Sequence, residues 1–294
     1  MSRFSHFLAV DWSGAKGPRQ KGIALAVALA EGGPPKLVTP PDPKGWARAD
    51  VLALLLDLPG ATLVGLDLGL SLPFQDAGAF FPGWDASPAD ARALWAMIDA
   101  LCADDPHLEA GSFLAHTEVA RYFRHGAGIE GDRFLLAGAA SREGRFRVAE
   151  AAQRQQGVRP VSNFNLVGAA QVGKSSLTGM RMLHRLAGRV PIWPVDPLPG
   201  DGPLITEIYT SMAARLGGKK GTATKLRSIE ALNDALDALG SPPVAGSGAI
   251  DDHASDALLT AAWLRKVHGN RDLWHPAALT QEVARTEGWT FGAL

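Results

Sequence analysis

The feature that most constrains the fold is an apolar run, Phe7 to Val10, that ends in an acid, Asp11. A run without polar alternation is typical of a strand buried on both faces, and an acid at its end reaches the edge of the sheet. A second run of this kind, Thr62 to Leu66, ends in Asp67. The two runs predict a pair of core strands, each of which carries a carboxylate at its end.

A third acidic group stands near the carboxyl end, where Asp251-Asp252-His253-Ala-Ser-Asp256 precedes the apolar segment Ala257 to Val267. His253 and Asp256 are three positions apart and therefore share one face of a helix. The apolar segment can bury itself against a sheet that carries Asp11. The simpler alternative is a helix start, in which Asp252 is the N-cap and the helix dipole favours Asp256.

Three acids at the ends of three core elements predict one metal site. Asp11, Asp67 and Asp256 are the expected oxygen ligands of Mg²⁺ or Mn²⁺, because hard cations prefer carboxylates. We expect His253 to be a further ligand or a proton carrier. Weaker candidates for the metal are Asp252, Glu118 and Glu207.

Periodicity and turn residues predict a hairpin, a short third strand, a helix and a fourth strand in the first part of the chain. These elements are Phe7–Asp11 and Lys21–Ala30 as an antiparallel pair, Leu37–Thr39, the helix Trp46–Leu58 and the strand Leu63–Leu68. Further expected helices are Ser87–Cys102 with Ser87 as N-cap, Glu118–Arg124, Arg147–Gln156, Ser176–Leu186 and Ile229–Leu239, and a further strand is Pro203–Thr210.

Composition excludes several classes of protein. Cys102 is the one cysteine of the 294 residues, so an intramolecular disulfide and a cysteine zinc cage are excluded. Apolar runs such as Ile23 to Ala30 are too short to span a bilayer, and Asp11 interrupts any signal-peptide layout. We therefore expect a cytoplasmic protein that does not contact a membrane.

Charge is unevenly distributed along the chain. The formal net charge is −1, yet residues 115–190 hold 12 Lys and Arg against 5 Asp and Glu. Such a basic segment can bind nucleic acid beside an acidic site, and a solvated helical surface explains it equally well.

The segment Gly168 to Ser175 fits the P-loop pattern, with Lys174 at the lysine position. A phosphate-binding loop should follow a buried parallel strand, whereas Val161 to Val167 is partly polar and prolines interrupt Ile192 to Asp196. We therefore expect Lys174 not to bind a nucleotide. A further alternative is that the turns after Asp11 and Asp67 are the paired phosphate-binding turns of an actin-like ATPase or sugar kinase. The two turns stand too close in sequence to belong to separate domains, as they do in those proteins.

Several short motifs together resemble a bacterial domain-of-unknown-function family described as predicted RNase H-like nucleases. The motifs are Val64 to Pro73, Thr117-Glu118, Phe164 to Met180, Trp193-Pro194, Glu207 to Ser211 and Asp251 to Trp263. The last motif is also similar to the final helix of Holliday-junction resolvases, where a His or Asp precedes the last Asp by three positions. At Asp67 the chain departs from the resolvases, in which Glu is common.

This resemblance implies an α/β fold with an RNase H-like mixed sheet, in which three antiparallel strands are followed by parallel strands and helices flank the sheet. It implies a single domain over residues 1–294 with a long, mostly helical insertion at 74–202. The implied activity is metal-dependent cleavage of a phosphodiester. A nucleotide phosphotransferase, of the actin-like or P-loop kind, and a catalytically silent binding module remain alternatives.

Overall fold

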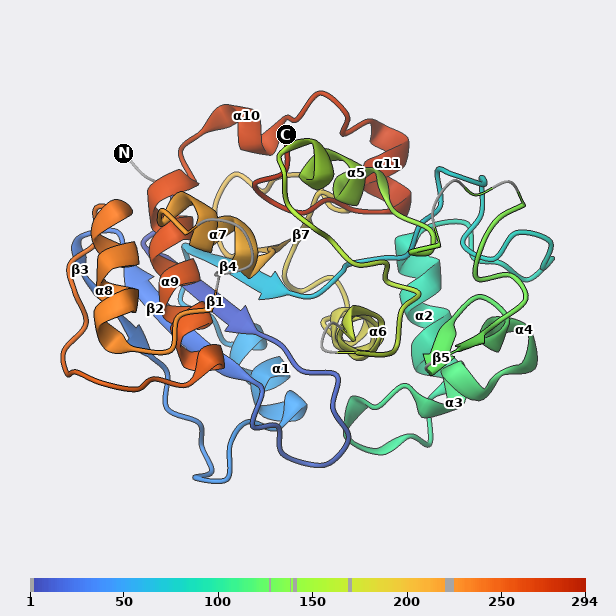
Figure 1. Ribbon diagram of the computed structural model, residues 1–294, viewed down its shortest axis with the longest axis horizontal. Helices are drawn as coiled ribbons and strands as arrows, with labels where there is room; N and C mark the ends of the chain where they lie inside the picture. The colour runs from blue at the N-terminus through green and yellow to red at the C-terminus, as the bar shows by residue number, and fades with distance from the viewer. Residues whose placement is uncertain (1–2, 127, 138, 140–141, 169–170, 220–224) are drawn as a thin grey trace.

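A six-stranded mixed sheet runs through the centre of the molecule (Figure 1). The computed structural model describes residues 3–294 apart from 127, 138, 140–141, 169–170 and 220–224. The strands, in their order across the sheet, are β3 (Gly32–Leu37), β2 (Ala24–Leu29), β1 (His6–Asp11), β4 (Thr62–Asp67), β8 (Leu204–Glu207) and β7 (Ile192–Trp193). The first three are antiparallel, whereas β1, β4, β8 and β7 are parallel neighbours.

The two central strands are those that end in acids. The apolar residues of β1 and β4 are almost completely buried because helices cover both faces of the sheet. Side chains alternate between these faces, so Phe7 and Ala9 join one hydrophobic cluster while Leu8 and Val10 join the other. The expected strands and the antiparallel hairpin are confirmed here.

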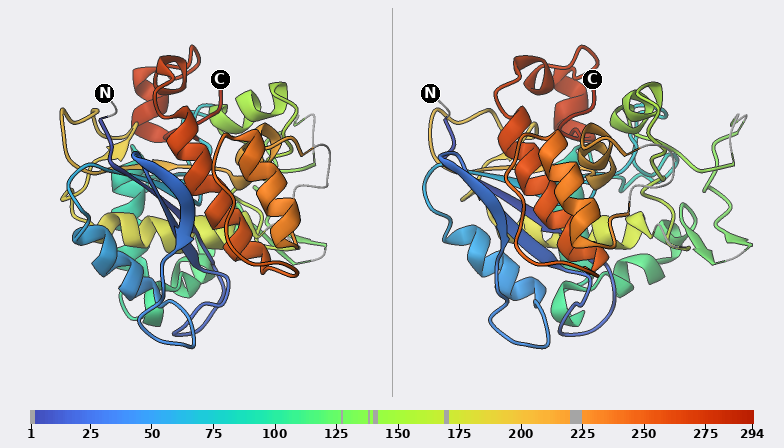
Figure 2. Two further views of the ribbon diagram at one scale, coloured as in Figure 1. Left: turned by 90° about the vertical axis from the view of Figure 1, so that its left-hand side faces the viewer. Right: turned by 60° about the vertical axis from the view of Figure 1, so that its left-hand side comes forward.

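Helices form a layer on each face of the sheet, as Figure 2 shows. One layer contains α1 (Arg48–Leu56), α2 (Ala91–Leu101) and α6 (Val172–Arg185). The opposite layer contains α7 (Thr210–Leu216), α8 (Ile229–Ala238) and α9 (Asp252–Val267), and α9 lies directly on β1 and β2. The expected mixed α/β architecture with helices on both faces is confirmed.

Shorter elements fill the connection between β4 and β8 and the carboxyl end. They are a 3₁₀ turn (Pro106–Leu108), α3 (Gly111–Ala115), α4 (Thr117–Ala120), β5 (Arg124–Gly126), β6 (Ile129–Glu130), α5 (Val148–Gln155), α10 (Arg271–Trp274) and α11 (Gln281–Thr286). The range expected as an insertion, 74–202, also contains β7, which pairs with β8 in the main sheet. Among the described residues no helix is long and apolar enough to cross a membrane.

Several expected boundaries are wrong, and two of them have a clear physical reason. The third strand is Gly32–Leu37 and not Leu37–Thr39, because Gly32 and Gly33, both at positive φ, turn the chain immediately after β2. Pro34 and Pro35 are tolerated there because β3 is an edge strand. Helix α2 begins after Asp90, whose carboxylate accepts from Ala93 N, whereas the Ser87 hydroxyl accepts from Phe81 N.

Candidate active site

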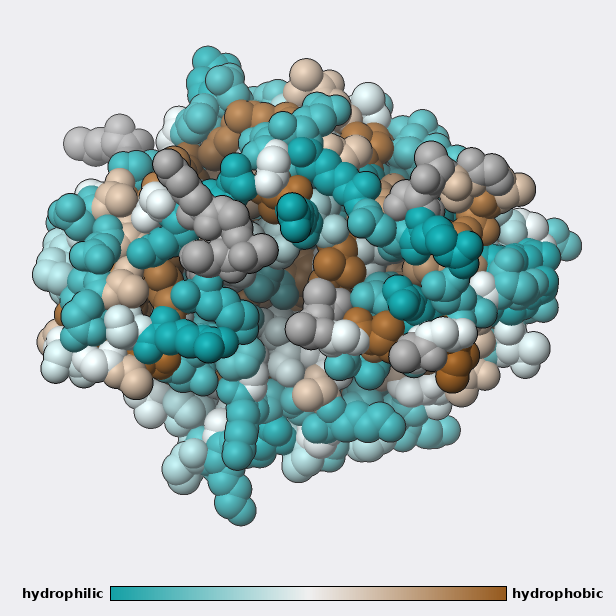
Figure 3. Space-filling view, in the orientation of Figure 1, coloured by the Kyte–Doolittle hydropathy of each residue, from teal (hydrophilic) through white to brown (hydrophobic). Residues whose placement is uncertain are grey.

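Asp11 and Asp67 lie side by side at the carboxyl ends of β1 and β4. The parallel register pairs the two residues directly. Both continue the alternation of Phe7, Ala9 and Leu63, so both belong to the face that α9 covers. Over these strand ends the surface is hollowed at the centre of the view in Figure 3.

Helix α9 brings His253 and Asp256 to the same place. Asp251 is the N-cap of this helix, since its Oδ1 accepts from the backbone nitrogens of His253 and Ala254. The alternative that made Asp252 the N-cap is therefore wrong by one residue. The helix starts so that His253 Nδ1 lies 2.7 Å from Asp11 Oδ2, and Asp11 is only 7% exposed.

The three carboxylates influence one another electrostatically. Burial raises the pKa of Asp67 well above its usual range, and the charges of Asp11 and Asp256 raise it further. Burial, followed by the charge of Asp11, raises the pKa of Asp256 to about 7. Burial also raises the pKa of Asp11, against the opposing hydrogen bond from His253. These three residues, called the acid cluster below, therefore repel one another in a poorly hydrated place.

The hydrogen bond to Asp11 raises the pKa of His253 above its usual value. When the ring is protonated, its Nδ1 donates to the Asp11 carboxylate. The His253 side chain is 45% exposed, so it can exchange protons with solvent. On the other side of the cluster, Thr210 Oγ1 lies 3.4 Å from Asp67 Oδ2.

Glu207 was a weaker candidate for a metal ligand, but its carboxylate forms an ion pair with Arg147. The register places Glu207 level with Leu66 and not with Asp67. Arg147 donates to both carboxylate oxygens of Glu207, at 2.6 and 2.8 Å, and also binds Glu150. Leu70 N and the Thr290 hydroxyl donate to Glu207 as well. Arg147, Glu150 and Glu207 are called the arginine cluster below.

Two other weaker candidates also have cationic partners. Asp252 forms ion pairs with Lys225 and Arg227, which precede α9 in the sequence. Glu118 lies on α4, far to the right of β1 and β4 in Figure 1, and pairs with Arg121. In the described parts of the chain, no three His, Cys, Asp or Glu side chains stand as a ready group of metal ligands.

The P-loop-like segment lies beside the acid cluster without the expected strand in front of it. Of its residues, Ala169 and Ala170 lie outside those described. Before them, Asn165 makes one isolated bridge to Arg124 and no named strand ends there. The first turn of α6 packs against the turn after β1 so closely that a Cβ on Gly14 would lie 2.4 Å from the backbone of Lys174 and Ser175.

The arginines of the basic segment are mostly engaged within the protein. Arg145 and Arg147 are buried, Arg145 on Asp76 and three backbone carbonyls. Arg121 and Arg124 form ion pairs with acids of the same segment. Arg145 and Arg147 are therefore not available to a phosphate backbone, whereas Arg142 has an 84% exposed side chain.

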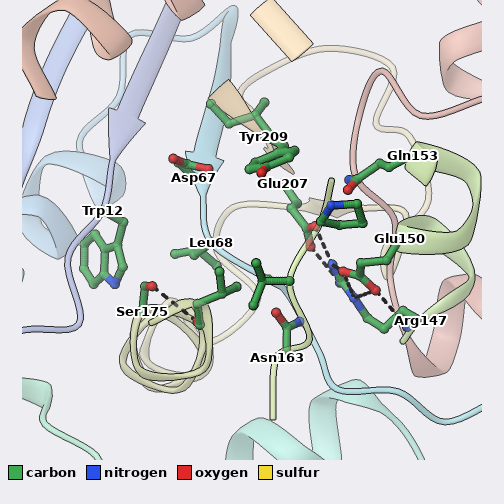
Figure 4. Close-up of a pocket in the computed structure, with 15 residues that line it drawn as sticks. Trp12, Asp67, Leu68, Arg147, Glu150, Gln153, Asn163, Ser175, Glu207 and Tyr209 are labelled. Atoms are coloured by element: carbon green, nitrogen blue, oxygen red, sulfur yellow. Dashed lines mark hydrogen bonds and ion pairs between the residues drawn. The ribbon is translucent and has the colours of Figure 1, made fainter. Parts of the chain in front are cut away.

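Sequence reasoning missed the residues that surround Asp67 on the side away from α9. A cavity of about 140 Å³ opens there, and Gln153, Asn163 and Tyr209 contribute to its lining (Figure 4). No motif marks these residues, because they come from α5, a loop and the turn after β8. Comparisons of the chain with protein-family models, with curated proteins and with solved structures found no match.

Proposed function

We propose that the protein is a divalent-metal-dependent phosphodiester hydrolase, a nuclease of RNase H-like fold. Support for this fold comes from the strand order, in which the antiparallel β3-β2-β1 is continued by the parallel β4 and β8. Further support is the position of α9 across β1 and β2. Residues 74–202 are then an elaboration between β4 and β8, and the expected compartment is the cytoplasm.

The observation that carries the proposal is the acid cluster itself. Asp11 and Asp67 are paired in register, and the charge of Asp256 acts on Asp67 from a third element. In the described part of the chain, no Lys or Arg forms an ion pair with any of the three. Acids that are clustered and partly buried raise each other's pKa and destabilise the fold unless a cation compensates them.

The donor atoms of the acid cluster are of the kind that binds Mg²⁺ or Mn²⁺, although among the described residues they do not stand as a ready group of ligands. All three side chains offer carboxylate oxygens, which these hard cations prefer over nitrogen and sulfur ligands. Bound there, such a cation would polarise a phosphoryl oxygen and lower the pKa of a water molecule. Asp252, Glu118 and Glu207 have cationic partners already, so we assign the ligand role to Asp11, Asp67 and Asp256.

Residues of the chain orient the carboxylates of the acid cluster and provide a proton carrier. His253 holds Asp11 through Nδ1, and its half-exposed ring can accept or release a proton near neutral pH. Thr210 orients the Asp67 carboxylate. The hollow above the strand ends admits a substrate chain from solvent. Nucleic acid is the proposed partner, with Arg142, Lys225 and Arg227 as exposed cations for its phosphates.

A cleavage assay tests this function. Single-stranded, double-stranded and branched DNA and RNA are incubated with the protein and Mg²⁺ or Mn²⁺. We expect metal-dependent cleavage that Asp67→Asn reduces to background, because the amide keeps the shape of the carboxylate and loses its charge. The exposed Asp57 provides the control, and Asp57→Asn should cleave like wild type. Folded protein that cleaves none of these substrates with either metal would refute the nuclease and favour a silent binding module.

A further inference from the structure

The cavity beside Asp67 is bounded by parts of the chain that are distant in sequence. Asp67 and Glu207 lie at the ends of β4 and β8, and Tyr209 follows β8. The opposite wall is formed by the N-cap residue of α5, Arg147, and by Glu150 and Gln153 on the helix itself, at intervals of three residues. Figure 4 shows these side chains around the open space, with Asp67 on one side and Gln153 on the other.

Most of the remaining surface of the cavity is apolar. Leu68, Val172 and Ile208 line it, and Pro160 and Val161 close it on the loop side. Tyr209 adds a half-buried aromatic ring whose pKa is raised by burial and by the charge of Asp67. A flat group with apolar faces would be in contact with such walls on both sides.

Gln153 supplies a polar side chain to the cavity. The residue is 3% exposed, and within the described residues its side-chain amide makes no hydrogen bond. Figure 4 shows this amide reaching from α5 toward the cavity. Asn163 differs, because its Nδ2 already donates to Ser71 O at 2.8 Å. Neither amide atom is sealed from solvent without a partner, so the amide is open to the cavity, where a ligand can meet both its donor and its acceptor.

The charges around the cavity disfavour an anion in it. Among the described lining residues Arg147 is the one cation, and the two carboxylates of Glu150 and Glu207 more than balance its charge. Asp67 would repel a phosphate that entered without a metal ion. The suitable occupant is therefore neutral, planar and apolar on its faces, with donors and acceptors on its edge.

We propose that this cavity is a subsite for a nucleobase, with Gln153 contacting the base edge and Tyr209 contacting its face. The glutamine amide offers one donor side and one acceptor side, which is the pattern that pairs with a base edge. The inference rests on the proposed nuclease function, since the base would belong to a nucleotide next to the phosphate that is cleaved at Asp67. It adds that the protein selects among bases at this position.

Binding of nucleosides in EDTA tests the subsite separately from the metal and from cleavage. Adenosine, guanosine, cytidine, uridine and thymidine are titrated one at a time and followed by ligand-observed NMR, with ribose 5-phosphate as the probe that lacks a base. We expect at least one nucleoside to bind in the millimolar range or tighter, and ribose 5-phosphate not to bind. Gln153→Leu should weaken nucleoside binding about tenfold.

Matched variants separate recognition from a general disturbance of α5. Gln155 lies on the exposed side of the same helix, so Gln155→Leu should bind like wild type. Gln153→Glu keeps the size and replaces the amide donor by oxygen, and it should change the order of preference among the nucleosides. Unfolding midpoints near that of wild type show that the variants are folded.

The two proposals can fail independently. Equal binding of nucleosides by wild type and by both Gln153 variants, equal binding of ribose 5-phosphate, or no binding of any nucleoside would overturn the subsite. Asp67→Asn should abolish cleavage and still bind nucleosides. Nucleoside binding without any cleavage by wild type would therefore refute the nuclease and leave the subsite standing.

Discussion

Two groups of buried acids lie at neighbouring strand ends, and they differ in their partners. In the arginine cluster, Arg147 donates to Glu150 and Glu207, and the nearby Glu287 accepts from three backbone nitrogens. In the acid cluster, His253 is the one basic group that contacts a carboxylate, among the residues described. The comparison teaches that burial alone does not mark a functional acid. An acid whose charge the protein leaves uncompensated is the better candidate.

The arginine cluster should be the more costly of the two to break. Replacing Arg147 by Leu leaves Glu150 and Glu207 buried without their cation, so the free energy of unfolding should fall by about 3 to 5 kcal/mol. Urea denaturation measures this change. Arg142→Leu, at an exposed arginine of the same segment, should change stability by less than about 0.5 kcal/mol. A similarly small loss for Arg147→Leu would mean that Glu207 does not depend on this ion pair.

The acid cluster should respond to metal, whereas the arginine cluster should not. Mg²⁺ or Mn²⁺ at about 100 times its dissociation constant should stabilise the wild-type protein by roughly 2.7 kcal/mol, and EDTA should reverse the gain. Asp11→Asn should abolish this gain, because the amide loses the charge that the cation compensates. Glu207→Gln should lower the baseline stability and keep the response. A response that disappears in Glu207→Gln and persists in Asp11→Asn would reverse the assignment of the two clusters.

Without metal, the acid cluster should make stability depend on pH. The pKa of Asp256 rises on folding from 3.8 to about 7, so its stabilising contribution is complete below the lower value and is lost as pH rises through the upper one. In EDTA, Asp256→Asn should therefore reduce the fall in stability between these values. The expected gain at pH 8 is about 1 kcal/mol or less, because the side chain is partly hydrated. If stability depended on pH in the same way in Asp256→Asn as in wild type, burial and the neighbouring charges would not raise the pKa of Asp256.

The smallest effect is expected at Glu118, which pairs with Arg121 on the surface. Glu118→Gln should change the free energy of unfolding by less than about 0.5 kcal/mol. The variant should also keep the full stabilisation by Mn²⁺. A lost metal response in a denaturation experiment would bring this residue back as a ligand.

The central elements were predictable because each carries a local signal. The buried strands β1 and β4 and the acidic start of α9 follow from apolar runs and from the spacing of the acids. By contrast, β3 is a proline-containing edge strand without a burial pattern of its own, so its position could not be read from hydrophobicity.

The sequence could not predict which residues, distant along the chain, contact one another at the site. Arg147 and Glu207 are 60 positions apart, and no local pattern predicts that they meet. For this reason Glu207 was named as a candidate ligand, although Arg147 compensates its charge. Gln153 faces the cavity only because α5 packs beside the end of β8, which is a tertiary contact that the helix pattern does not encode.

The most direct test of the account is a crystal structure of the protein soaked in Mn²⁺, with anomalous diffraction to locate the metal. The account predicts an anomalous peak in contact with the carboxylates of Asp11 and Asp67, with Asp256 turned toward it and Glu207 still bound to Arg147. A peak on the arginine cluster, or a structure in which Asp11 and Asp67 hold no manganese at saturating concentration, would contradict the account.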